Sequence, residues 1–149
     1  MKTALVFGGT RFFGVNLVQE LLNKGVKVTV ATRQNSEIPF GNKVETLKLD
    51  RFDLDSVKEA VSGRTWDVVF DQICFNARDA RIAIQTLTDK IHTYIFTSTM
   101  SVYDYAENVI EAEFYPYSYP ISDTLPDKVT FRKENGRRRR YFSKRQLFL

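Results

Sequence analysis

One turn, between a short apolar segment and a helical pattern, constrains the fold of this chain more than any other feature. The apolar segment is Thr3–Phe7, and the turn reads Gly8-Gly9-Thr10-Arg11-Phe12-Phe13-Gly14. A strand that runs through such a turn into a helix presents backbone N–H groups at the helix start, where a pyrophosphate can bind. The first glycine permits the tight turn, and the last permits close helix–strand packing. We therefore expect all seven residues of this loop to contact a dinucleotide.

Two arginines bear on which dinucleotide it is. Arg11 stands in the middle position, where a glycine would let the backbone approach the phosphates. It gives up some of that closeness but could offer a guanidinium instead. The second expected strand runs into Thr32-Arg33, with no acid there for a ribose 2′-hydroxyl. Arg33 could hold a 2′-phosphate, or it could be a solvated loop residue. The cofactor is expected to be NAD or NADP, with a lean towards NADP.

Short apolar segments alternate with helical patterns along the first hundred residues. Such alternation implies parallel strands joined by right-handed crossovers, and nearly continuous apolar strands imply a sheet covered on both faces. The predicted fold class is α/β, a doubly wound parallel sheet of the Rossmann type. Strands are expected over residues 3–7, 26–31, 44–49, 67–70 and 93–97, and helices over 13–23, 53–61 and 76–87.

Local signals give three further predictions. Gly25 is expected to end the first helix in a left-handed conformation. Asp53 is a reasonable N-cap for the second helix. The third helix is expected to present Ala80, Ile84 and Leu87 on its apolar face.

Composition excludes several classes of protein. The chain has 149 residues, 43% of them hydrophobic and 27% charged, which is typical of one globular domain. No apolar run reaches the roughly 18–20 residues of a membrane span, and the N-terminus lacks the features of a secretion signal. The single cysteine, Cys74, can form neither an internal disulfide nor a metal cluster, and no metal site is expected. Cys74 is expected to be a small buried hydrophobe. These features predict a cytoplasmic protein without a membrane partner.

Charge is divided unevenly along the chain. The net charge is +4, but residues 132–149 hold eight basic groups and one acid, so residues 1–131 carry −3. We therefore predict an incomplete cofactor-binding domain over 1–131 and a basic tail over 132–149. Four consecutive arginines, Arg137–Arg140, repel one another, so the tail is expected to be poorly ordered or ordered only against another chain. Any nucleic-acid binding would have to rest on this tail, and we disfavour it.

Three motifs in order resemble the extended short-chain dehydrogenase/reductase family, in its NAD-dependent epimerase/dehydratase branch acting on nucleotide sugars. They are the glycine loop, Asp50-Arg51-x-Asp53, and Thr97-Ser98-Thr99-Met100-Ser101-Val102-Tyr103. The resemblance covers about residues 1–131. It implies that Gly8, Gly9 and Gly14 are the loop glycines. It also implies that Asp50 contacts the adenine, with the Arg51 amide beside it.

The same resemblance assigns roles to two later segments. Thr99 would be the catalytic hydroxyl, hydrogen-bonded to a substrate oxygen. The segment near the ribose falls on residues 71–74, where small side chains are usual and Ile73 departs from the pattern. The alternative for residues 97–101 is a strand end that is merely rich in small polar residues.

The family's chemistry also needs a tyrosine followed four residues later by a lysine, to act as general acid/base. After Tyr103, tyrosines stand at 105, 115, 117, 119 and 141, and none has a lysine at that spacing. The family's substrate-binding half is also missing. Back-translating residues 134–143 with freely chosen codons and shifting the frame gives Lys-Arg-Gln-Ala-Glu-Ala-Val-Phe-Phe, which resembles the family's continuation. We therefore hypothesise a frameshift near codon 132.

Three functions compete. The first is an NAD(P)-binding domain of the epimerase/dehydratase type, inactive as written, whose intact relatives take a nucleotide sugar. The second is a dinucleotide-sensing regulator without turnover. The third is an RNA-binding relative that uses the basic tail. We also consider a homo-oligomer in which a second copy covers the apolar surface left by the missing half.

Overall fold

The computed structural model describes residues 1–34, 37–97, 130–134 and 137–141. The chain divides into two compact units, one made of residues 1–74 and 79–97 and the other of 75–78 and 98–149. The predicted boundary at residue 131 stays a prediction. No helix in the described part of the chain is long and apolar enough to span a membrane.

The first unit is built on a five-stranded, wholly parallel sheet in the order β3-β2-β1-β4-β5. This confirms the predicted α/β doubly wound class. The strands are β1 (Thr3–Phe7), β2 (Lys27–Thr32), β3 (Glu45–Lys48), β4 (Trp66–Asp71) and β5 (Ile91–Phe96). The helices are α1 (Phe13–Asn23), α2 (Leu54–Ala60) and α3 (Ala77–Leu87), with a 3-10 turn η1 at Gly41–Lys43. The bounds of β1 and α1 are those predicted, and the bounds of the other elements differ from the predicted ones by at most two residues.

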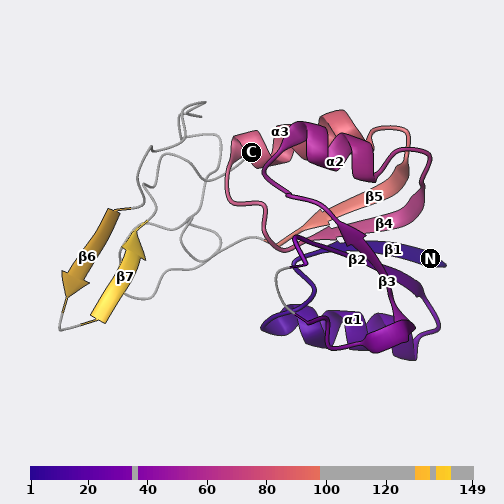
Figure 1. Cartoon of the computed structure of the whole chain (residues 1–149), viewed down its shortest axis with the longest axis horizontal. Coiled ribbons are helices and arrows are strands. Elements are labelled where there is room, and N and C mark those ends of the chain that lie inside the picture. Colours follow the sequence, from indigo (N-terminus) through magenta and orange to yellow (C-terminus); the bar gives the residue numbers. More distant parts are fainter. Residues whose placement is uncertain (35–36, 98–129, 135–136, 142–149) are drawn as a thin grey trace, which may run out of the picture. The chain divides into compact units, whose positions relative to one another are not determined.

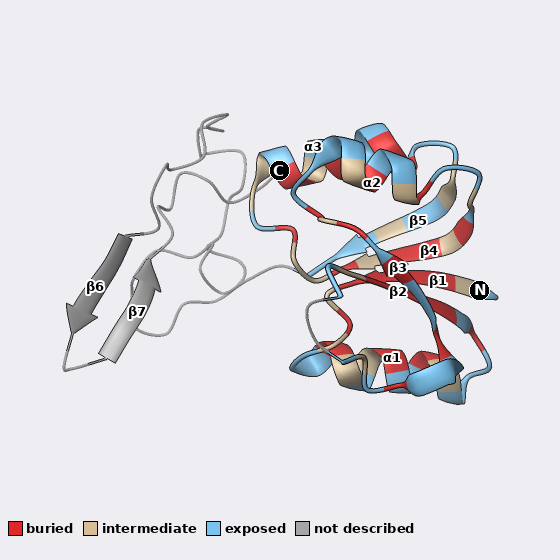
Figure 2. Cartoon of the chain, in the orientation of Figure 1, coloured by how far each residue is buried: buried red, intermediate tan, exposed pale blue. Residues whose placement is uncertain are grey.

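Both faces of the sheet are covered, as Figure 1 shows: α2 and α3 lie on one face and α1 on the other. The side chains pointing in opposite directions from β1 belong to two separate cores. Leu5 and Phe7 join the cluster under α2 and α3, whereas Ala4 and Val6 join the cluster over α1. In Figure 2 the buried positions follow these two interfaces. The apolar run of β1 is therefore explained by burial on both sides.

Helix ends follow the local signals. The side chain of Asp53 accepts a hydrogen bond of 2.7 Å from the Ser56 N–H, which confirms the predicted N-cap of α2. Gly25 has a φ of +71° after α1, the left-handed conformation that was expected.

The predicted apolar face of α3 is correct at Leu87, which is buried, and wrong at Ile84. Ile84 is 65% exposed, and the buried side is formed by Asp79, Ile82, Ala83, Thr86 and Leu87. Two residues of this buried side, Asp79 and Thr86, are polar, so the pattern of hydrophobic residues in the sequence does not reveal it. Thr86 is satisfied inside the helix, because its hydroxyl donates to the Ile82 carbonyl at 2.7 Å.

The second unit contains a described antiparallel pair, β6 (Thr130–Glu134) and β7 (Arg137–Tyr141). The basic tail was expected to be poorly ordered or ordered only against another chain, and no strand was predicted in it. Asn135-Gly136, between two strand-length segments, is a strong hairpin signal that this expectation left out. The register places Arg132 opposite Arg139 and Lys133 opposite Arg138.

Candidate dinucleotide site

The loop between β1 and α1 is packed so closely that three glycines are required. A Cβ on Gly14 would lie 2.5 Å from the Gly8 carbonyl oxygen and would also collide with the Gln72 side chain. A Cβ on Gly9 would lie 2.9 Å from Val18 Cγ2. Gly8 has a φ of +83°, which confirms the predicted tight turn. The loop therefore holds its backbone open on one side and pressed against the sheet on the other.

Phe12 gives this loop an unusual backbone. It has φ 50° and ψ −137°, a left-handed conformation that a bulky residue rarely adopts, and it is 89% exposed. Such strain costs of order 1–3 kcal/mol and is typical of functional loops. The helix starts without a side-chain cap or an acid in its first turn. The positive end of the α1 dipole is thus not neutralised by the helix itself, which suits a phosphate.

The crevice of such a sheet lies where the strand order reverses, which here is between β1 and β4. The end of β4 meets the glycine loop at this point. Gln72 N–H donates to the Phe7 carbonyl at 3.2 Å, and its side chain reaches Gly14. Ile73 Cγ2 would lie 2.9 Å from a Cβ on Gly8. Ile73 also packs against the core under α2 and α3, which explains a bulky residue where the family resemblance implies a small one.

The ends of β2 and β3 lie at the same edge of the sheet. Arg33 follows β2 directly and is exposed, as a contact to a ribose phosphate requires. Asp50 follows β3, where its N–H donates to Ser56 Oγ at 2.9 Å and its Oδ1 accepts from the Phe52 N–H at 3.0 Å. The Asp50 carboxylate is therefore fixed in direction before any ligand arrives.

The side chain of Arg51 does not belong to the adenine site that is expected around Asp50. Its side chain is buried at 3% exposure and pairs with Asp71, through Nε at 2.9 Å and Nη2 at 2.5 Å. Nη2 also donates to the Asp79 carbonyl at 2.8 Å, and the guanidinium lies 5.2 Å from the Phe7 ring centroid. Tyr94 donates its hydroxyl to the same Asp71 oxygen at 2.6 Å. Only the Arg51 backbone amide remains a candidate for the adenine contact.

This buried network ties together strand ends that border the crevice. Asp71 Oδ1 accepts from the Ile73 N–H at 3.1 Å, and the Asp71 carbonyl accepts from the Thr97 N–H at 2.9 Å. Burial would lower the pKa of Arg51, but the adjacent carboxylate outweighs it and raises that pKa. The pKa of Tyr94 is raised by burial and by the same carboxylate. The guanidinium thus stays charged and the phenol stays protonated.

Cys74 follows this segment and is buried, as predicted. Burial, together with Asp71, raises the pKa of its thiol from 9.0 to about 11. A thiol with so high a pKa is a poor nucleophile at neutral pH.

Thr99, the predicted catalytic hydroxyl, lies outside the described residues. The structure brings the glycine loop, Arg33 and Asp50 to one edge of one sheet. Sequence reasoning missed the Asp71–Arg51–Tyr94 network, because nothing in the sequence signals which buried acid an arginine will meet. The available hint of this network was that Arg51 and Asp71, which carry opposite charges, each follow the end of a predicted strand.

The contacts that Cβ atoms would make show that Gly8, Gly9 and Gly14 pack too closely against neighbouring residues for a larger side chain. A family model described as NAD(P)H-binding matches residues 8–128. The chain belongs to the NAD(P)H-binding family. The predicted relation to short-chain dehydrogenases and epimerases is confirmed at the level of fold, and dinucleotide binding is the property of this domain.

Individual relatives agree with this. A chloroplast stem-loop binding protein of 41 kDa from Arabidopsis thaliana is 35% identical over 115 residues, which are 68% of this chain and 30% of that protein. The UDP-Glc/GlcNAc 4-epimerase of Campylobacter jejuni has a TM-score of 0.65 at 16% identity, covering 77% of this chain and 43% of the epimerase. A short-chain dehydrogenase/reductase from Burkholderia multivorans with bound NADP has a TM-score of 0.61 at 17% identity, covering 78% of this chain and 67% of the reductase. The chain thus spans less than a third of its Arabidopsis relative.

Proposed function

We propose that this domain binds NADP(H) in preference to NAD(H), with the phosphates on the glycine loop and the adenine beside Asp50. The observation that carries the preference is Arg33, which is exposed directly after β2 at the edge that holds the loop. Residues 32–34 contain no carboxylate that could accept a ribose 2′-hydroxyl. A guanidinium at this position favours a phosphate instead.

Titration of the purified chain with NADPH and with NADH tests this preference. A hydrogen bond to a charged group contributes about 1.5–3 kcal/mol, so Arg33→Ala should weaken NADPH binding at least tenfold. NADH binding should be unchanged. Lys58→Ala, which removes one positive charge from the exposed side of α2, is the matched control. Equal affinity of the unaltered chain for both cofactors would refute the preference.

A second part of the proposal concerns turnover. We propose that this chain binds its cofactor without catalysing a redox or epimerase reaction, because no tyrosine after Tyr103 has a lysine four residues later. General acid–base catalysis contributes about a hundredfold to ten-thousandfold in rate. The assay is turnover of nucleotide sugars with either cofactor, with Thr99→Ala as the comparison. Clear turnover that disappears in this variant would refute the proposal. Sequencing the gene tests the frameshift hypothesis separately.

One observation supports a second candidate function. The Arabidopsis relative is named for binding stem-loops, and the tail of this chain, residues 132–149, is strongly basic. We propose that the chain also binds a nucleic-acid stem-loop. Retention of a labelled RNA hairpin that weakens steeply with salt would support this, since phosphate contacts release counterions. No binding at low salt would refute it.

A further inference from the structure

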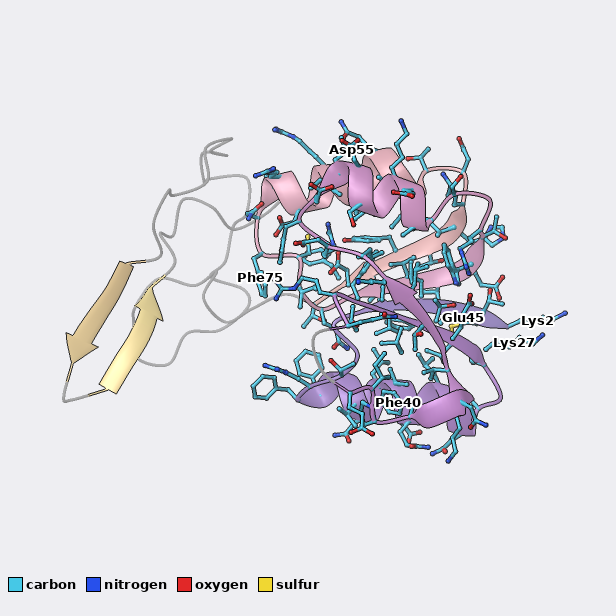
Figure 3. The ribbon with its side chains drawn as sticks, viewed as in Figure 1. Lys2, Lys27, Phe40, Glu45, Asp55 and Phe75 are labelled. Atoms are coloured by element: carbon cyan, nitrogen blue, oxygen red, sulfur yellow. The ribbon has the colours of Figure 1, made fainter. Side chains whose placement is uncertain are left out.

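The amino-terminal edge of the sheet, opposite the dinucleotide site, carries a row of basic residues. Each of the five strands starts at or just after one of them. In the spatial order of the strands they are Lys43, Lys27, Lys2, Arg64 and Lys90. Because all five strands are parallel, these starts meet at one edge. Figure 3 shows Lys2 and Lys27 projecting from it together.

Backbone contacts fix the order of this row. The Lys27 N–H donates to the Lys2 carbonyl at 2.9 Å, and the Trp66 N–H donates to the Lys90 carbonyl at 2.9 Å. Neighbouring strands lie about 4.8 Å apart, so four spacings give a row of about 19 Å. Measured along the axis of a duplex, that length spans roughly five or six phosphates of one strand, at about 3.4 Å of axial rise each.

A cavity of about 570 Å³ opens within this row. Its charged lining is formed by Lys27, Lys43, Arg64 and the carboxylate of Glu45, with apolar side chains and the polar side chains of Asn42 and Thr65 between them. Its volume falls within the roughly 300–1,000 Å³ typical of ligand sites. The ammonium, hydroxyl and amide groups of this lining can bind phosphate oxygens, while the Glu45 carboxylate is paired with Arg64.

Three acids, Glu45, Asp67 and Asp89, stand at the same edge as the five basic residues of the row, so the row keeps an excess of positive charge. Glu45 is paired with Arg64, which lowers the pKa of the carboxyl, so that glutamate neutralises one member of the row. Asp67 accepts from the backbone N–H groups of Lys2 and Thr3. Neither Lys27 nor Lys43 forms an ion pair within the described residues.

Helix dipoles explain only part of the row. Lys90 follows α3 and donates to the Thr86 carbonyl at 3.2 Å, as cations at helix C-termini do. Arg64 follows α2. Lys27 likewise lies four residues after the end of α1, and Lys43 is the last residue of the 3-10 turn η1, so within the row Lys2 is the member that follows no helix.

We propose that this amino-terminal edge binds the sugar–phosphate backbone of a nucleic-acid stem. The proposal deepens the second candidate function by naming a surface other than the tail. Paired rather than unpaired bases are expected, because Trp66 is buried and its indole N–H is held by Thr29 at 3.0 Å, so it offers no stacking face. Lysine ammonium groups bind phosphates as point charges without reading bases.

The test uses the full chain, a fluorescein-labelled RNA hairpin and a salt series. Each lost phosphate contact should reduce the slope of log K against log salt by about 0.9. Lys27→Gln/Lys43→Gln should therefore lower the slope by about 2 and the affinity about 30-fold at ~0.15 M salt. Lys48→Gln/Lys58→Gln removes the same charge from positions outside the row and outside the dinucleotide site, and should change the affinity less than threefold. All of these side chains are exposed, and circular dichroism checks their folds.

Two further arms separate the possible failures. Replacing Arg137–Arg140 by glutamine tests the tail. If that variant alone loses the hairpin while the edge variant binds normally, the edge proposal is wrong and stem-loop binding survives. If the unaltered chain does not bind the hairpin, both are wrong. Equal losses in the two double variants would also overturn the edge proposal, because they would indicate a general charge effect. Competition by inorganic phosphate at concentrations matching the added nucleotide would show a small-anion site instead.

Discussion

Replacing Asp71 by asparagine should reveal how far the buried ion pair holds the first unit together. The substitution keeps the shape of the side chain but leaves the Arg51 guanidinium, at 3% exposure, without its counter-charge. Breaking a buried pair in this way costs about 3–5 kcal/mol. A domain of this size has about 5–15 kcal/mol of stability in total, so the variant should be close to unfolding. Removing both charges should be milder, because no charge is then stranded.

Urea unfolding followed by fluorescence measures this effect cleanly. The chain has a single tryptophan, Trp66, and it is buried in the core beside α2 and α3. We expect Asp71→Asn to lower the free energy of unfolding by about 3–5 kcal/mol, and Arg51→Met/Asp71→Asn to recover at least ~1 kcal/mol of that loss. Tyr94→Phe removes one hydrogen bond to the same carboxylate and should cost about 1–3 kcal/mol. The reasoning would be refuted by a cost below ~1 kcal/mol for Asp71→Asn, or by a double variant less stable than the single one.

Two other changes should have effects of known sign. Gly14→Ala should abolish dinucleotide binding and lower the unfolding midpoint, because its Cβ would lie 2.5 Å from the Gly8 carbonyl; calorimetry checks both, and Gly25→Ala, which has open space but a φ of +71°, reports the backbone cost alone. Equal effects of the two would contradict the proposed clash. Cys74 should resist iodoacetamide at pH 8 until the protein unfolds. Because folding raises the pKa of its thiol from 9.0 to about 11, stability should be fully present below pH 9 and fall as the pH rises to 11. A smaller alkaline loss in Cys74→Ala supports this origin, and an unchanged loss assigns it to Tyr94.

The fold was predictable because short apolar segments alternate with helical patterns along the first hundred residues. β1 is apolar on every residue that faces either core, and the Gly8–Gly14 spacing places the turn without ambiguity. The face of α3 was not predictable from hydrophobicity, because Asp79 and Thr86 point inwards and Ile84 outwards. Their polar groups find partners inside the fold, so burial does not carry its usual cost there.

The site was predictable only where a residue acts through its backbone or its position. Glycine is required at positions 8 and 14 because a Cβ atom would collide with neighbouring residues. Gly8 and Gly14 can be recognised directly from the sequence. Arg51 was predicted to border the adenine, but its side chain belongs to a network that joins it to Asp71, twenty residues later in the chain. Which side chains meet in this network depends on the order of the strands in the sheet. β1 lies beside β4, and the ring of Phe7, at the end of β1, packs against the guanidinium of Arg51. The row of basic residues at the amino-terminal edge was not predictable for the same reason, since its members are scattered along the sequence.

The two proposed sites lie at opposite ends of the parallel strands, one strand length apart. Whether ligand binding at one site affects binding at the other can therefore be tested. β1 links the basic edge to the glycine loop through five residues, or about 16 Å. Charges at that separation are screened at physiological salt, where the Debye length is about 8 Å. Saturating NADPH should therefore change the affinity for the RNA hairpin less than twofold, although both ligands are strongly negative. Displacement of the hairpin by NADPH in fluorescence anisotropy would instead place both ligands at the carboxyl edge, where Arg33 and the start of α1 offer the alternative phosphate contacts.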